Sequence, residues 1–439
     1  MKVLKFGSST VASAQRIKET AELVAKLPKG GDIIVLSAIK ETSDTLEEIA
    51  DYLYKKNPDG AKELTNQLEH KYISLARELY AEPKVASVTT EIKKRFDEIR
   101  ALSKDIFTLF EEKKIIAQGE LLLTHLFSEY LIDLGIKAKV IPALDFMKID
   151  KNEEADNVFI KNELAKQIEK AGKADIYITQ GFICRNAYNE IDNFGNGGSD
   201  YSSALIGAAI EADEIQIWSD RDGIYNNDSS IVKEAKPVAK LSFDEAAELS
   251  YFGNGDKILH PTCILPAKLA NIPVRLMNIL QPQSEGTLIS TDYTPNKIEA
   301  IAAKEGITAI KIKSGKMLLA HGFLRRVSEI FESYKTSVDM ITTSEVGLSV
   351  TIDNDKHLDE IVNDLKMFGT VTVQKGMTIV CVVGDLHDDN IGFQAKVVNA
   401  LKAIPVSMIS YGGSFHNISF LIHSKDKDAA LRALNSALF

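Results

Sequence analysis

Short apolar runs rich in β-branched residues recur through the first two thirds of the chain, separated by segments with helical spacing. The runs are "KVLKF" from Lys2, "DIIVLSA" from Asp32, "AKVIPA" from Ala138, "DIYITQGF" from Asp175 and "EIQIWSD" from Glu214. After the first run, "AQRIKETAELVAKL" places apolar residues near i, i+3, i+4 and i+7. Strands that alternate with helices predict an α/β fold, in which a mostly parallel sheet is sandwiched between two layers of helices.

A long charged interval interrupts this alternation. From roughly residue 45 to residue 130, leucines and isoleucines recur at helical rather than strand spacing. We therefore expect a helical insertion within a first domain that spans residues 1–295.

The pattern changes again after about Ile301, where compact units repeat the order strand, helix, strand. The first unit reads "TAIKIKSG", "GFLRRVSEIFESY" and "GLSVTID", and the second reads "MTIVCVVGD", "GFQAKVVNALKAI" and "NISFLIHS". Pro295 and the polar residues of "TDYTPNKIEA" indicate a boundary just before them. We expect two related small α/β modules over residues 296–439.

The composition is that of a globular protein with more than one domain. The 439 residues are 45% hydrophobic and 26% charged, and 52 Lys plus Arg against 62 Asp plus Glu give a net charge of -10. An acidic chain lacks the broad positive field that attracts nucleic acid, so any bound phosphate must be held by local groups.

Cysteine usage and hydropathy indicate the compartment. The three cysteines, Cys184, Cys263 and Cys381, are far apart and lack metal spacing, so we expect small buried side chains in a reducing cytoplasm. No apolar run approaches the ~20 residues that a membrane helix needs, and the N-terminus lacks a secretory core. We expect a soluble, cytoplasmic protein.

A glycine-rich segment, "DNFGNGGSDYSSALIGAAI" from Asp192, follows a predicted strand and leads into a helix of small residues. Gly197 and Gly198 allow a backbone to approach a ligand, and Ser199 or Asp200 can cap a helix whose first N–H groups attract an anion. Alone, the segment could be only a helix start.

A second such turn, "KFGSST", ends the first strand and places Lys5 beside Gly7 and the hydroxyl of Ser8. A strand, a glycine turn, hydroxyl groups and a helix can cradle phosphate, although the Walker spacing is absent. By itself this turn could equally be structural.

Two further segments lie farther along. "IWSDRDGIYNNDSS" places Ser219 and Asp220 at the carboxyl end of a strand, where open α/β sheets bind ligands, although Asp-Gly is also an ordinary turn. "FGNGDKILHP" contains Lys257, which as a lone lysine would be solvated. It also contains His260, which precedes a proline and could do no more than mark the end of a helix.

Together these segments resemble the aspartate kinases of the amino-acid kinase superfamily over nearly the whole chain. "KFGSSTV" looks like that family's opening KFGGTSV, and "QGE" from Gln118 looks like its HGE. "TQGF" and "GGSDYSSALIGAAI" are similar to its substrate segment, and "WSDRDGIY" and "KILHP" to its nucleotide-side motifs. "SVDMITTSEV" from Ser337 resembles the effector-binding stretch of its regulatory ACT modules.

The resemblance implies transfer of the γ-phosphoryl group of ATP, with Mg²⁺, to the side-chain carboxylate of L-aspartate, giving 4-phospho-L-aspartate, the first step toward lysine, threonine and methionine. A carboxylate with a pKa near ~3.9 is already ionised at neutral pH, so no general base is required. Charge neutralisation and in-line positioning must bring the two anions together.

The resemblance also assigns roles to individual residues. The catalytic residues would be Lys5 and Asp200. The substrate would be bound by Ser37, Ser43, Glu120, Asn196, Gly198 and Ser199, with Glu120 on its ammonium group. ATP would be bound by Lys5, Gly7, Ser8, Ser219, Asp220, Tyr225 and Lys257. No side chain is assigned as a metal ligand.

An effector site is implied as well. Free lysine would bind between C-terminal modules that join two chains into a homodimer, with Asp339 receiving an ammonium group. The effector-binding residues would be Met317, Gly322, Phe323, Ser337, Val338, Asp339 and Ser344.

The chain departs from the family at four places, one of which is the loop after the second strand, where Lys40 and Glu41 replace flexible or neutral residues. Ser8 replaces a glycine, which a serine tolerates if φ stays negative. Asp228-Ser229-Ser230 replaces Asp-Pro-Arg, so a phosphate-facing guanidinium is absent. Asn196 stands where the family has an arginine that pairs with a carboxylate of the substrate. Losing that pair would weaken the binding free energy of aspartate by on the order of 1.5–3 kcal/mol, unless another cation such as Arg185 compensates.

These departures leave two alternatives to the aspartate kinase hypothesis. One is a catalytically impaired paralogue that senses an amino acid through its C-terminal modules. The other is a kinase for a different amino acid.

Overall fold

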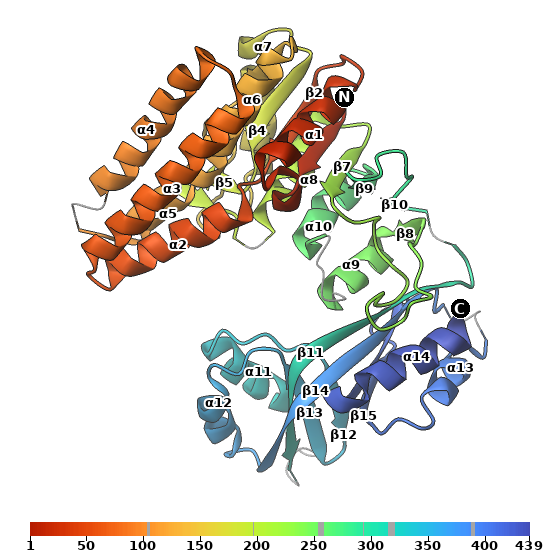
Figure 1. Ribbon diagram of the computed structural model, residues 1–439. Helices are drawn as coiled ribbons and strands as arrows, with labels where there is room; N and C mark the ends of the chain where they lie inside the picture. Colours follow the sequence, from red (N-terminus) through yellow and green to blue (C-terminus); the bar gives the residue numbers. More distant parts are fainter. Residues whose placement is uncertain (103–105, 196, 253–258, 293, 315–320, 388–390) are drawn as a thin grey trace. The chain divides into compact units, whose positions relative to one another are not determined.

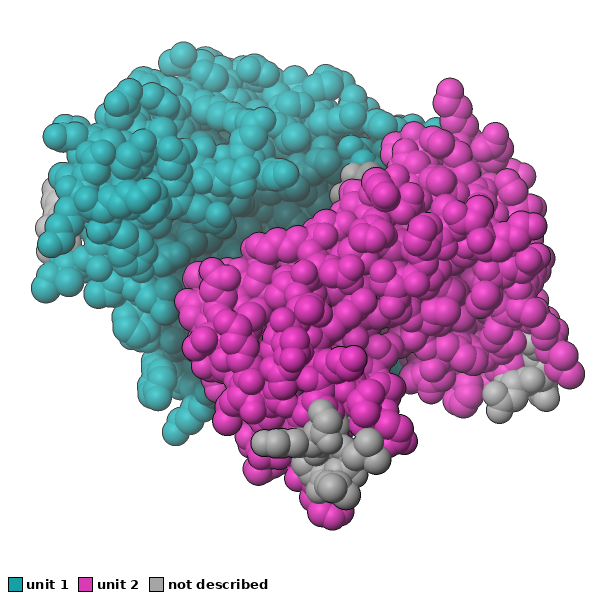
Figure 2. Space-filling view, turned by 90° about the horizontal axis from the view of Figure 1, so that it is seen from below, with its two compact units in different colours: residues 1–223, 258–291 teal, residues 224–257, 292–439 magenta. Residues whose placement is uncertain are grey.

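The computed structural model describes residues 1–439 apart from 103–105, 196, 253–258, 293, 315–320 and 388–390. Its internal contacts divide the chain into two units: residues 1–223 with 258–291, and residues 224–257 with 292–439 (Figure 2). The expected division into domains at residue 295 stays a prediction.

The first unit is built on a mostly parallel sheet with the strand order β3-β4-β2-β1-β7-β9-β10 (Figure 1). Its strands are β1 (Val3–Phe6), β2 (Asp32–Leu36), β3 (Ala138–Val140), β4 (Ile176–Gln180), β7 (Ile215–Ser219), β9 (Val274–Asn278) and β10 (Thr287–Ser290), with a small hairpin of β5 (Ile183–Arg185) and β6 (Ile191–Asn193). Only the β9–β10 pair within this order is antiparallel. The five strands expected from the apolar runs and the parallel α/β fold are confirmed.

The helices of this unit include the expected insertion, whose described part consists of helices joined by short non-helical segments. They are α1 (Ala14–Ala25), α2 (Lys40–Tyr54), α3 (Pro58–Leu79), α4 (Lys84–Leu102), α5 (Leu109–Ile116), α6 (Gln118–Asp133), α7 (Asn157–Ala171), α8 (Gly198–Ile210) and α10 (Pro261–Leu269), with short 3-10 turns at Ser8–Val11 and Ala143–Asp145. Tyr72 and Phe96 of the insertion share one apolar core with Phe6 of the sheet. The insertion is therefore packed onto the sheet as part of the same folding unit.

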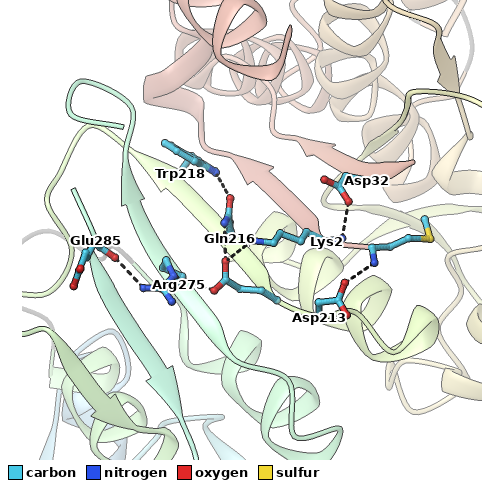
Figure 3. A network of polar contacts seen from close by, with 9 residues as sticks. Lys2, Asp32, Asp213, Gln216, Trp218, Arg275 and Glu285 are labelled. Carbon is cyan, nitrogen blue, oxygen red and sulfur yellow. Dashed lines mark hydrogen bonds and ion pairs between the residues drawn. The ribbon is translucent and has the colours of Figure 1, made fainter. Parts of the chain in front are cut away.

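A polar network ties together the strands that carry the predicted site (Figure 3). Glu214, just before β7, accepts hydrogen bonds from Gln216 on that strand (2.6 Å), Arg275 on β9 (2.9 Å) and Lys2 beside β1 (3.3 Å). Gln216 in turn accepts a hydrogen bond from the indole of Trp218 (3.2 Å). The network joins three neighbouring strands at their amino ends and so supports the register at their carboxyl ends.

The second unit contains one six-stranded sheet with the order β12-β13-β11-β14-β16-β15. The elements of this unit are β8 (Lys240–Ser242), α9 (Phe243–Phe252), β11 (Ile298–Lys313), α11 (Phe323–Ser333), β12 (Ile341–Ser344), β13 (Gly347–Ile352), α12 (Leu358–Leu365), β14 (Thr370–Gly384), α13 (Phe393–Ala400), β15 (Val406–Tyr411), β16 (Asn417–His423), a 3-10 turn at Ser424–Asp426 and α14 (Lys427–Leu438). The two expected modules appear as two apolar cores, one with α11 and α12 and one with α13 and α14. Both modules share the long strands β11 and β14, which the sequence patterns did not show.

The network around Glu214 should make the stability of the fold depend on pH. Burial raises the pKa of this carboxyl group, but the hydrogen bonds from Gln216 and Arg275 and the charges of Arg275 and Lys2 outweigh burial, so the net pKa is lowered. A lowered folded-state pKa stabilises the fold above the unfolded-state value, and this contribution is lost as the pH falls through the folded value.

We therefore expect Glu214→Gln to lower the free energy of unfolding by about 1–3 kcal/mol at pH 7. The difference from the unmodified chain should begin to shrink near the unfolded-state pKa of about 4.3. It should disappear only below the lowered folded-state pKa, where the carboxylate is protonated in both states. Urea denaturation at several pH values measures this, with the exposed Glu22→Gln on α1 as control. A pH-independent difference would contradict the account.

Candidate active site

The predicted site residues of the first unit meet at the carboxyl edge of its parallel sheet. Phe6 of β1 is in register with Leu36 of β2 and Trp218 of β7, so the residues that follow these strands lie side by side. Gly7 N–H donates to the carbonyl of Trp218 (3.1 Å), and Ser37 N–H donates to that of Phe6 (3.3 Å). This edge is where open α/β sheets bind ligands.

Lys5 and Asp200 form an ion pair at the centre of this edge. The ammonium nitrogen lies 2.6 Å from Asp200 Oδ1, and the two side chains are 12% and 11% exposed. Asp200 belongs to the first turn of α8, where the helix dipole favours a negative charge. The backbone N–H of His260 reaches the other carboxylate oxygen at 3.4 Å.

Helix α8 begins differently from the expectation. The N-cap is Gly197, whose φ is +73°, and the cap makes no side-chain hydrogen bond. The prediction that Ser199 or Asp200 caps the helix was wrong, because both residues lie inside the first turn. The carboxylate of Asp200 pairs with Lys5, so no capping side chain competes for the first N–H groups of α8.

Three glycines let backbones approach closely around this turn. A Cβ atom at Gly197 would lie 2.1 Å from the ring of His260, and one at Gly198 would lie 2.7 Å from the ring of Phe182. A Cβ atom at Gly181 would overlap Ser199, at 2.8 Å. The turn from strand β4 to helix α8 is thus held by contacts that only glycine permits.

Ser8 lies in a 3-10 turn (Ser8–Val11) that starts at Gly7, so its backbone keeps the negative φ that a serine requires. Gly7 itself has φ −72°, and a Cβ atom there would lie 3.4 Å from the Lys5 ammonium nitrogen. The departure from the family at Ser8 is therefore compatible with the fold of this loop.

Glu120 is a buried carboxyl group near the same edge. It lies in the first turn of α6, is 4% exposed and accepts a hydrogen bond from the backbone N–H of Ala38 at 3.3 Å. Burial raises its pKa to about 8, against the smaller opposing effect of backbone hydrogen bonds. Such a carboxyl group gains stability from a cationic ligand.

The other predicted residues of this unit are near the same strand ends. Ser37 follows β2 and is half-buried, and Ser43 lies in the first turn of α2, half-buried. Ser219 ends β7, where its hydroxyl accepts from Arg221 N–H (3.2 Å), and Asp220 follows as an exposed residue. Ser37 and Ser219 thus lie at the carboxyl ends of β2 and β7, the two strands that flank β1, and Ser43 lies on the helix that follows β2.

Some predicted residues do not join this group. Asn196 and Lys257 lie outside the described residues, as does Met317 of the effector set. Tyr225 belongs to the second unit, where it bridges to Pro237. Arg185, the candidate substitute for a missing guanidinium, donates to the carbonyls of Leu144 (2.9 Å) and Asn189 (2.7 Å), which favours a structural role in its hairpin.

The three cysteines are free and buried, as expected. The described residues hold no group of three or more His, Cys, Asp or Glu side chains arranged for a metal ion. Within the described residues no helix is long and apolar enough to cross a membrane.

A cavity of about 1030 Å³ opens beside the glycine-rich segment, on a different face of α8. Its walls include Phe194, Tyr201 and Leu265, and they do not include Lys5, Glu120 or Asp200. The cavity is therefore separate from the group of predicted catalytic residues.

The effector residues lie in the second unit. Gly322 is the N-cap of α11 with φ +76°, and Phe323 is buried in the adjoining core. Ser337, Val338 and Ser344 are exposed. Asp339 has a fully buried side chain that already contacts Lys304 and Tyr251, two residues that the sequence patterns did not single out.

Comparison with known proteins places this geometry in a family. A profile of the Amino acid kinase family matches residues 1–278, and an ACT domain profile matches residues 380–438. "Aspartokinase 1, chloroplastic" of Arabidopsis thaliana is 33% identical to the chain and is matched over all of the chain and 80% of its own length.

The chain belongs to the aspartokinase family.

Two solved structures of this family have the same fold over the whole chain. Escherichia coli aspartokinase III in complex with aspartate and ADP (R-state) is 28% identical with a TM-score of 0.87, covering all of both chains. The same enzyme in complex with lysine and aspartate (T-state) is 29% identical with a TM-score of 0.84, covering all of this chain and 99% of the other. The family resemblance and the expected fold class are confirmed.

The buried carboxyl group of Glu120 should release a proton when an ammonium group binds beside it. With a pKa of about 8, Glu120 is mostly protonated at pH 7, whereas a bound ammonium group favours its ionised form. Binding of L-aspartate should therefore release close to one proton at pH 7, and the proton released by Glu120 should diminish as the pH rises through about 8.

Calorimetry in buffers of different ionisation enthalpy counts these protons. The release should disappear in Glu120→Gln, which should also bind aspartate more weakly, by about tenfold or more. Glu129→Gln, on the same helix, is the matched control. Equal proton release by the Glu120→Gln variant would remove this residue from the binding site.

Proposed function

We propose that this protein transfers the γ-phosphoryl group of ATP to the side-chain carboxylate of L-aspartate. The observation that carries the proposal is the meeting of the Lys5–Asp200 ion pair, the glycine turn before α8 and the buried Glu120 at one sheet edge of an aspartokinase-family chain. A family structure that contains aspartate and ADP supports these substrates.

The reaction must bring an anionic carboxylate against an anionic phosphate. The Lys5 ammonium group neutralises negative charge as the carboxylate oxygen attacks the γ-phosphorus and ADP leaves. Asp200 positions this ammonium group from the first turn of α8. The attacking oxygen needs no deprotonation, since the substrate carboxylate is already ionised at neutral pH.

Substrate recognition follows from the same geometry. Glu120 receives the substrate ammonium group. The first-turn N–H groups of α8 near Ser199 face a substrate carboxylate, whereas the N–H of Gly198 already donates to the carbonyl of Gly195 (3.0 Å). Ser37 and Ser43 complete the amino-acid side of the pocket. Asn196 replaces a charge-assisted contact by a neutral one, so aspartate binds more weakly than it would to an arginine.

ATP binds on the β1 and β7 side of the edge. Gly7, Ser8, Ser219 and Asp220 approach it there, with Lys257 and Tyr225 assigned by resemblance alone. Mg²⁺ enters as part of the nucleotide substrate, because it binds phosphate oxygens while keeping several waters.

The C-terminal modules regulate the enzyme through lysine. A family structure with lysine and aspartate supports this effector, and Asp339, with Ser337, Val338, Ser344, Gly322 and Phe323, is the proposed site. Calorimetry with lysine, threonine and methionine tests the choice, and binding of threonine without lysine would reverse it.

Two chains pair through these modules. Ile341 on β12 and Ile409 and Tyr411 on β15 are exposed apolar side chains that a second chain would cover. Sedimentation at micromolar concentration should give twice the chain mass of 48.4 kDa, and Ile409→Glu should shift the protein toward the single-chain mass. A single-chain mass for the unmodified protein would contradict the pairing.

The central activity test uses ATP, Mg²⁺ and L-aspartate with hydroxylamine, which traps an acyl phosphate. Lys5→Met should lower kcat by about 10²–10³, equivalent to about 2.7–4 kcal/mol of transition-state stabilisation, because it removes the cation beside the transferred group. Lys26→Met at the exposed end of α1 is the control for loss of one charge.

The same assay with a panel of amino acids decides between the alternatives. Trapped product with another amino acid but not with aspartate would replace the substrate and keep the kinase. No product with any acceptor, together with lysine binding, would favour the sensing paralogue.

A further inference from the structure

Four charged or polar side chains of the second unit form one cluster around the proposed effector carboxylate. The ammonium nitrogen of Lys304 on β11 lies 2.8 Å from Asp339 Oδ1 and 2.8 Å from Asp353 Oδ2. The same nitrogen lies 4.5 Å from the ring centroid of Tyr251. The Tyr251 hydroxyl donates to Asp339 Oδ1 at 2.9 Å.

The charges of this cluster do not balance. Two carboxylates share one ammonium group, which leaves one negative charge in excess. Burial lowers the pKa of Lys304, but hydrogen bonds to Asp339 and Asp353 outweigh burial and raise it, so the ammonium group stays protonated. The Asp339 side chain is 0% exposed and that of Asp353 is 39% exposed, so Asp339 is the carboxylate whose burial is costly without cationic donors.

The two oxygens of Asp339 differ in their contacts. Oδ1 accepts from Lys304 and Tyr251. Oδ2 is buried and, within the described part of the chain, has no hydrogen-bond donor. A buried carboxylate oxygen without a donor in a cluster of net charge −1 is suited to one more cationic donor, such as an amine.

We propose that Asp353, Lys304 and Tyr251 are positioning residues of the effector site, and that they make Asp339 selective for an amine and connect it to helix α9. The proposal rests on the proposed lysine site at Asp339. Asp353 shares the charge of Lys304, so Asp339 is not fully neutralised and its Oδ2 can receive an effector ammonium group.

Tyr251 gives the cluster its connection to the rest of the unit. This residue lies in the last turn of α9, which begins with a reciprocal cap between Ser242 and Glu245 (2.7 and 3.2 Å) and contacts β11 and β14. A change at the Asp339 carboxylate therefore acts directly on the end of α9.

The first test is lysine binding to full-length Asp353→Asn, measured by calorimetry. We expect the Kd for L-lysine to rise about three- to fivefold, and this difference to shrink in 0.5 M salt, because Asp353 acts only through its charge. The control is Asp355→Asn, which removes a carboxylate paired with Lys375 in the same unit.

The second test is Tyr251→Phe, which keeps the ring beside Lys304 and removes only the hydroxyl. Lysine should bind with a Kd within about threefold of the unmodified value, while the inhibition that saturating lysine produces falls about fivefold or more. Tyr334→Phe, which removes a similar hydroxyl–carboxylate bond to Asp364, is the control.

The outcomes separate this inference from the function on which it rests. Absence of lysine binding to the unmodified protein would overturn the proposed effector site and this inference with it. Lysine binding that Asp353→Asn leaves unchanged would overturn the charge role alone, and inhibition that Tyr251→Phe leaves unchanged would overturn the connection to α9.

Discussion

The ion pair between Lys5 and Asp200 is the interaction on which the site depends. It joins the first strand to the first turn of α8 and leaves an ammonium group at the sheet edge where two anionic substrates must meet. Much of the surrounding sequence maintains this pair: the Glu214 network supports the register of β1, β7 and β9, and Gly197 and Gly198 bring the start of α8 against His260 and Phe182. Since the chain is acidic overall, charge neutralisation must come from such fixed local groups.

Two buried carboxyl groups, Glu120 and Asp339, are both suited to receive an amine. Glu120 at the proposed substrate site accepts from the backbone N–H of Ala38, and within the described residues Asp339 Oδ2 at the proposed effector site has no hydrogen-bond donor. Each therefore gains stability when an amine arrives, so part of the cost of burying a carboxyl group in the free protein becomes affinity for the ligand. The difference is that Glu120 is neutralised by a proton, whereas Asp339 is held by Lys304 and Tyr251.

The strands, the helical insertion and the sheet-edge position of Lys5, Gly7, Ser37 and Ser219 could be predicted from apolar spacing and from the ends of apolar runs. The cap of α8 could not, because Ser199 and Asp200 are typical capping residues and only the pairing with Lys5 shows why Gly197 takes that position.

The shared strands β11 and β14 were missed for a physical reason. Gly306 and Gly376, with φ of +76° and +69°, interrupt the apolar pattern as turns do, yet the register shifts between Lys304 and Ala309 show that β11 continues through an irregularity. Lys304 and Tyr251 carry no motif, so only the fold relates them to Asp339.

The central claim is that the aspartate carboxylate itself attacks the γ-phosphorus beside Lys5, and oxygen labelling tests it most directly. L-aspartate labelled with ¹⁸O in its side-chain carboxylate would be incubated with ATP, Mg²⁺, hydroxylamine and the protein. Hydroxylamine displaces phosphate from the acyl carbon, so the released inorganic phosphate keeps the oxygen that bridged carbon and phosphorus. Mass spectrometry of that phosphate should show one ¹⁸O atom per phosphate. Phosphate without ¹⁸O would mean that water attacks ATP, and would contradict carboxylate phosphorylation at this site.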